Sequence, residues 1–222
     1  LRLCVASLAV MDLLLVVPAA MPSAVRPLLP VAVRLLDDEC TVKTVSVEDG
    51  ALIMTGESAK MRRFLTRANL PGPVYGFEAS HRLQVLVIYP VLTLGFVLAW
   101  PLGRSRKLAA TLIALCLVVL LAAMDAGLMF VWCGAEVFDQ VWLQLRDSLV
   151  PTPETTAAVE ALQREFDRLL LAKSFLSTGG RQFLCLVTAA LTLLTVSPRG
   201  RHETASKVVT GVRRQCPSAQ SG

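Results

Sequence analysis

The sequence predicts a mainly helical, polytopic membrane protein with about four transmembrane helices and a small external segment that contains a β-hairpin. Hydrophobic residues make up 54% of the 222 residues and charged residues 18%, whereas soluble domains have about 25% charged residues. Two nearly charge-free runs, 83–102 and 108–131, are separated by a basic pentapeptide. Residues 41–56 differ from both, because they carry β-branched residues around an Asp-Gly pair.

The two charge-free runs predict a transmembrane helical hairpin over residues 83–131. An α-helix rises about 1.5 Å per residue, so about 20 residues cross the hydrocarbon core of a bilayer. Residues 83–102 meet this length, and residues 108–131 exceed it while containing one acid, Asp125. The basic turn 103–107 then connects two antiparallel membrane helices.

Two weaker apolar segments bring the expected number of spans to about four. Residues 1–25 predict a first transmembrane helix or signal anchor, although the run contains Asp12 and two prolines. The alternative is a cleaved signal peptide with Arg2 as its basic region. Residues 175–197 predict a fourth transmembrane helix, in which Arg181 precedes the apolar run and its long side chain reaches for the interface.

The distribution of charge predicts the orientation of these helices. The turn 103–107 has three basic residues and no acid, and the tail 198–222 has five basic residues and a single acid. Lys and Arg accumulate on the cytoplasmic side of membrane proteins. We therefore expect cytoplasmic N- and C-termini, a basic, disordered cytoplasmic tail, and external segments at 26–82 and 132–174, where acids and bases are mixed.

Both external segments carry recognisable patterns. In segment 26–82, the runs 41–47 and 51–56 flank Asp49-Gly50, a pair typical of a tight β-hairpin turn because glycine accepts positive φ. In segment 132–174, apolar residues between Val159 and Leu170 recur every three or four positions, which predicts an amphipathic helix. Such a helix packs within the chain, lies on the outer leaflet, or docks to a partner.

Two acids inside the predicted spans, Asp12 and Asp125, are the candidate intramembrane polar contacts. An acid at the bilayer centre costs about 2.5–3.5 kcal/mol on insertion scales, so it faces protein or water. One interpretation is an interhelical hydrogen bond or a pair with a basic residue. The other is an ion or proton path, for which the sequence offers no third buried ionisable residue to continue a relay.

The cysteines and histidines suggest little chemistry. None of the six cysteines forms a CxxC pair, and a disulfide between Cys40 and Cys133, both expected outside, is conceivable but not determined by sequence. His81 and His202 are expected at the surface. They are not expected to bind a metal, because a metal site needs several convergent ligands. The motifs HExxH, GxSxG and GxxxxGK[ST] are absent from the sequence. We therefore expect no enzymatic activity, cofactor, metal or nucleic-acid partner.

Short motifs at the ends of the predicted hairpin indicate a family. Ile88-Tyr89-Pro90 lies near the start of the second span and Ala99-Trp100-Pro101 at its end, while Met124-Asp125 lies near the end of the third. In these motifs and in the order of elements over about residues 1–198, the chain resembles the small exosortase-associated integral membrane proteins of Gram-negative bacteria. The resemblance implies an accessory protein of the bacterial inner membrane, acting beside an exosortase-like enzyme in protein sorting and export.

The sequence thus predicts a non-enzymatic accessory or assembly subunit of an inner-membrane complex, in contact with the lipid bilayer and a membrane protein partner. The principal alternative is a small transporter or channel component that uses Asp12 and Asp125. A third class, a membrane hydrolase with an unrecognised site, is also compatible with the sequence.

Overall fold

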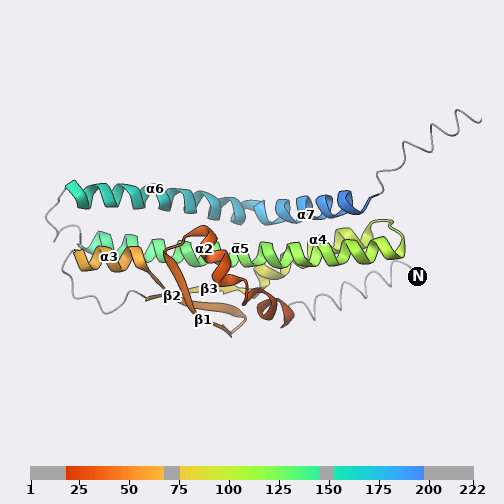
Figure 1. Ribbon diagram of the computed structural model, residues 1–222, viewed down its shortest axis with the longest axis horizontal. Coiled ribbons are helices and arrows are strands. Elements are labelled where there is room, and N and C mark those ends of the chain that lie inside the picture. Colours follow the sequence, from red (N-terminus) through yellow and green to blue (C-terminus); the bar gives the residue numbers. More distant parts are fainter. Residues whose placement is uncertain (1–18, 68–75, 146–152, 198–222) are drawn as a thin grey trace, which may run out of the picture.

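The computed structural model describes residues 19–67, 76–145 and 153–197, and these are mainly helical (Figure 1). Asp12 and the basic tail lie outside the described residues. In chain order, a short helix Ala19–Val25 is followed by the elements α2 Leu29–Leu36, β1 Cys40–Glu48, β2 Ala51–Ser58, α3 Ala59–Arg67, β3 Gly76–Arg82, α4 Leu83–Ala99, α5 Arg104–Leu145, α6 Pro153–Phe175 and α7 Arg181–Val196.

Helix α5 is the axis of the molecule. It runs without interruption for 42 residues, or about 63 Å at the rise of an α-helix. Figure 1 shows α4 and α7 beside one half of α5, α3 and α6 beside the other half, and the sheet near the middle. The expected boundary between a third span ending at residue 131 and an external segment is therefore not a break in the backbone.

Two described helices, Arg104–Leu143 and Val159–Val196, are long and apolar enough to cross a membrane, and a third candidate arises if Ala19–Val25 and Leu29–Leu36, bent by 57°, form one span. These properties are consistent with a membrane protein. Helix α4 has 17 residues, fewer than the 20 expected. It ends before Trp100, which has ψ 138°, because the following Pro101 disfavours helical backbone at that position.

The predicted β-hairpin is confirmed, and it belongs to a three-stranded antiparallel sheet of order β1-β2-β3. Asp49 and Gly50 both have positive φ, 49° and 74°, as a type I′ turn requires. Strand β3 was not expected. Its side chains alternate, since Phe77, Ala79 and His81 are buried while their neighbours are not.

The sheet packs on the middle of α5 through close contacts. The Phe77 and Phe130 rings lie 4.6 Å apart between centroids. Gly56 of β2 has no room for a side chain, because a Cβ there would collide with the Thr41 carbonyl and the Phe130 ring. Ala32 of α2 lies against Gly127 of α5, where an added Cβ would be 3.3 Å from the Ala32 Cβ. Sheet, α2 and α5 therefore share one core.

The half of α5 beside α4 and α7 differs in composition, with small residues inside and large apolar residues outside. Its interior contains small residues, among them Ala110, Ala114 and Ala189, which permit close approach of the helices as in membrane bundles. Its outer surface exposes large apolar side chains, including Phe96, Leu108, Leu112, Phe183, Leu191 and Leu194. An apolar surface of this extent is typical of contact with lipid or another protein.

Candidate functional site

The first of two polar clusters is centred on Asp125, near the midpoint of α5. Arg181 Nε donates to Asp125 Oδ2 at 2.8 Å, and Arg181 Nη2 donates to Oδ1 at 3.0 Å. The Asp125 side chain is 1% exposed and that of Arg181 15%. Both carboxylate oxygens therefore accept hydrogen bonds from one guanidinium in the bidentate geometry that gives strong charge-assisted hydrogen bonds.

Two further elements meet at this pair. His81, at the end of β3, is buried and places Nε2 3.5 Å from Asp125 Oδ2 without forming an aligned hydrogen bond among the described residues. The fully buried Tyr89 of α4 lies within electrostatic range of both Asp125 and Arg181. The expectation that His81 lies at the surface was wrong, because its side chain takes an inward position in β3. Sheet, α4, α5 and α7 thus converge on one carboxylate.

The interruption of helical geometry just before Arg181 explains how this residue reaches Asp125. Residues Leu176–Gly180 form a π-helical turn in which Thr178 and Gly179 leave helical geometry, with φ of 118° at Gly179. The Cβ-free Gly180 packs against the Phe175 ring.

Three backbone carbonyls at this break accept hydrogen bonds from side chains. The Ser177 and Thr178 hydroxyls donate to Ser174 O at 2.9 and 2.8 Å, Thr178 also donates to Phe175 O, and Arg181 Nη1 donates to Leu176 O at 3.3 Å. Arg181 therefore secures the break and binds Asp125 at the same time.

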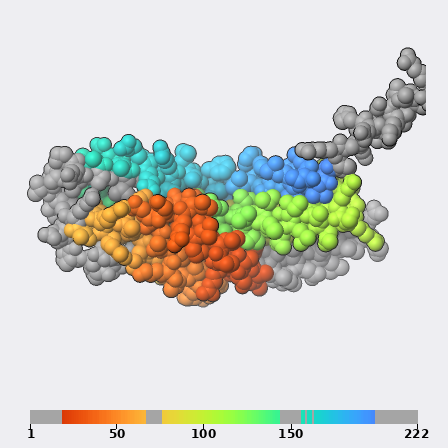
Figure 2. All heavy atoms as spheres, in the orientation of Figure 1, coloured from red at the N-terminus to blue at the C-terminus, as the bar shows by residue number. Residues whose placement is uncertain are grey.

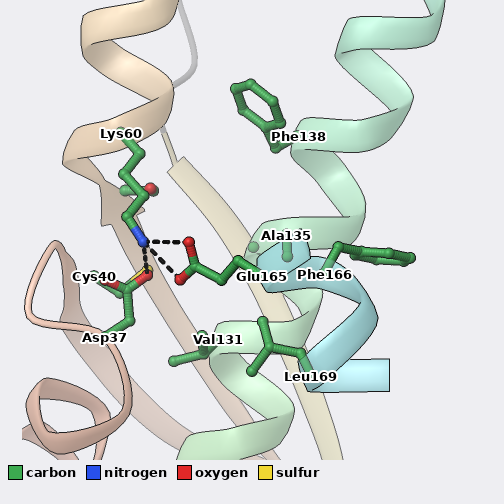
Figure 3. A pocket seen from close by; sticks show the side chains of 11 residues that line it. Asp37, Cys40, Lys60, Val131, Ala135, Phe138, Glu165, Phe166 and Leu169 are labelled. Carbon is green, nitrogen blue, oxygen red and sulfur yellow. Dashed lines mark hydrogen bonds and ion pairs between the residues drawn. The ribbon is translucent and has the colours of Figure 1, made fainter. Parts of the chain in front are cut away.

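The second cluster joins α3 to α2 and α6, and Figure 3 shows Lys60 between two carboxylates. Lys60 Nζ lies 3.2 Å from Asp37 Oδ2 and 2.7 and 2.8 Å from the two oxygens of Glu165. Burial opposes the charge of Lys60, but the hydrogen bonds to Glu165 and the charge of Asp37 outweigh this effect and raise its pKa.

Cys40 lies in the small cavity beside Lys60, and its thiol donates to Asp37 Oδ2 at 3.4 Å. Burial, reinforced by the charge of Asp37, raises the pKa of Cys40 to about 12, so the thiol is protonated and poorly reactive at neutral pH. Cys40 and Cys133 are both free thiols. In the structure the Cys40 thiol is directed to Asp37 and is not bonded to Cys133.

The structure brings together residues that sequence reasoning did not combine. Asp125 lies at the centre of the first cluster, whereas Asp12 is outside the described residues. The roles of Arg181 and Lys60 were missed. A signal existed for Arg181, since an unpaired base beside one apolar run and an unpaired acid within another suggest a pair.

The two clusters are suited to fixing the positions of helices and sheet. Among residues 19–67, 76–145 and 153–197, no three His, Cys, Asp or Glu side chains are grouped so as to hold a metal ion. Asp125 and Glu165 each engage a basic partner. No family model, curated protein or solved structure matches this chain.

Proposed function

We propose that this protein is a non-enzymatic accessory or assembly subunit of a bacterial inner-membrane complex, which it enters by holding an external αβ module on a rigid membrane-anchored stem. The observation that carries the proposal is the continuity of α5. One helix of 42 residues is about twice as long as the hydrocarbon core requires. Its second half therefore stands outside the bilayer, with the sheet and α3 fixed to it and α6 lying beside it.

Distances along the helices support the position that we propose for the bilayer. Asp125 is 21 residues after Arg104, which corresponds to about 31 Å of helix, the thickness of the hydrocarbon core. The short helices α4 and α7 begin near this level, since His81 and Arg181 contact Asp125. We place the basic turn 103–107 in the cytoplasm and the Asp125 cluster at the outer boundary, with the N-terminal segment as the first of four spans.

An assembly role fits the state of Asp125 better than ion transport does. A carboxylate that carries protons must exchange them with water or with another acid, whereas both oxygens of Asp125 are bound to Arg181. The exposed apolar surface of α4, α5 and α7 offers contact to lipid and to a membrane protein. From the sequence resemblance, the partner we propose is an exosortase-type enzyme.

The proposal is tested first by topology. Ser46 of β1 and Ser105 of the basic turn are both exposed, so Ser46→Cys and Ser105→Cys form a matched pair in a cysteine-free background. A membrane-impermeant thiol reagent applied to intact spheroplasts should label Cys at 46 and leave Cys at 105 unlabelled until the membrane is opened. Equal labelling of the two variants would contradict the proposed threading.

The second arm separates assembly from transport. Affinity-purified protein should bring down a membrane protein in fixed stoichiometry, and vesicles containing the purified protein alone should show the proton and cation flux of empty vesicles. Flux that Asp125→Asn abolishes without loss of assembly would replace the proposal by the transport alternative.

A further inference from the structure

Helix α6 lies against α5 with two small cavities between them, and Phe138 of α5 and Phe166 of α6 line both cavities. Protein interiors normally leave few voids of this kind. In the space-filling view, α6 and α7 form a ridge along one side of the molecule, so α6 covers its neighbours from outside (Figure 2). No described side chain of α6 is buried, whereas α2 and the sheet contribute buried residues to the core.

Polar contacts hold α6 in place at two points. Glu165, near the middle of α6, binds Lys60 of α3 with both oxygens, and its side chain remains 38% exposed. Lys173, near the end of α6, lies over the Trp132 ring with Nζ 2.8 Å from the ring centroid, a cation–π contact. Water reaches the Lys60–Glu165 pair, so this contact can exchange with solvent at modest cost.

The break at Leu176–Gly180 separates α6 mechanically from α7. Thr178 and Gly179 lie outside helical geometry, so the backbone between α6 and α7 departs from regular helix at these two residues. Immediately after the break, Arg181 is anchored to the buried Asp125. A rotation of the backbone at Thr178 and Gly179 therefore displaces α6 while α7 remains in place.

We infer that α6 is a hinged strap: it opens away from α5 about Thr178 and Gly179, and the Lys60–Glu165 pair holds it closed. Opening exposes the apolar face of α5 around Ala135 and Phe138 and gives solvent access to the cavity that contains Cys40 (Figure 3). The inference concerns the motion of α6 and is independent of the proposed partner.

Cys40 is the natural reporter of this motion, because its side chain is buried beneath α6 and becomes accessible on opening. The experiment uses the full chain in detergent or nanodiscs with every cysteine except Cys40 replaced by alanine. The decisive variant is Glu165→Gln, which removes the charge on α6 and leaves the Lys60–Asp37 pair intact. The matched control is Glu57→Gln, which removes an equivalent carboxylate from the pairs with Lys43 and Arg62 on the sheet and α3.

We expect Glu165→Gln to raise the rate of Cys40 modification about tenfold, since modification reports the population of the open state when opening is fast. Glu57→Gln should leave the rate within about twofold of the parent. Lys60→Ala provides a second test: Lys60 lowers the pKa of Cys40, so its removal slows the intrinsic thiol reaction and an accelerated rate must come from access.

Two outcomes would overturn the inference. The first is a Cys40 modification rate in Glu165→Gln equal to that of the parent. The second is equal acceleration, in the Glu165→Gln background, of a variant that retains Cys185 as its single cysteine. Cys185 is a buried residue of α7. Faster modification of Cys185 would therefore indicate general loosening of the fold.

Discussion

The Asp125–Arg181 pair provides the strongest quantitative test of how the half of the molecule with α4 and α7 is joined to the half with α3 and α6. Asp125→Asn keeps the size of the side chain but leaves the Arg181 guanidinium without its counter-charge. Removing one partner of a buried ion pair costs about 3–5 kcal/mol. The Arg181 side chain retains 15% exposure, so water relieves part of this cost, and we expect a loss of about 3 kcal/mol in the free energy of unfolding.

The measurement is the free energy of unfolding in mixed micelles, followed by the fluorescence of Trp132, which lies two turns after Asp125 on α5. Asp139→Asn is the matched control, because Asp139 lies farther along the same helix, is partly exposed and lines a cavity. This control should change stability by less than about 0.5 kcal/mol.

The double variant Asp125→Asn/Arg181→Gln should lose less stability than Asp125→Asn alone, because no unpaired charge remains. A loss below about 1 kcal/mol for Asp125→Asn, the range of exposed ion pairs, would refute the assignment of this cluster as the buried junction of the two halves.

Two other predictions follow from the packing of the sheet and of Cys40. Gly56→Ala should destabilise the fold by about 2–3 kcal/mol, because its Cβ would meet the Thr41 carbonyl and the Phe130 ring, whereas Gly95→Ala, where nothing lies within 4 Å, should be neutral or stabilising in chemical unfolding. The pKa of Cys40 rises from 9.0 to about 12 on folding, so its contribution to stability is complete below pH 9 and is lost as the pH rises towards 12. At pH 11 the loss through this group is roughly 2–3 kcal/mol, and Cys40→Ala should therefore show a flatter decline of stability between pH 8 and 11; parallel declines would contradict the assignment.

The parts of the fold that sequence predicted are those determined over short distances along the chain. The turn at Asp49-Gly50 depends on two residues that accept positive φ. The two helices of the predicted transmembrane hairpin depend on the length of apolar runs. Strand β3 was missed because it lies directly before an apolar helix, which obscured the alternation of Phe77, Ala79 and His81.

The candidate site was predicted incompletely for a related reason. Asp125 was singled out because an acid within an apolar run is unusual, but its partner lies 56 residues away. Lys60 and Glu165 are separated by 105 residues, and each resembles an ordinary surface charge in its own segment. Neither pair produces a local pattern, because nothing in a sequence window records which helices pack side by side.

The sequence alone therefore determined the helical class, the apolar segments and the β-hairpin, since composition and local backbone preference suffice for these features. Tertiary structure decided that α5 continues from one half of the molecule into the other. It also decided that His81 is buried and that Arg181 and Lys60 find their carboxylates. The reason is that each of these outcomes depends on segments distant in the chain that come together when the apolar helix faces pack.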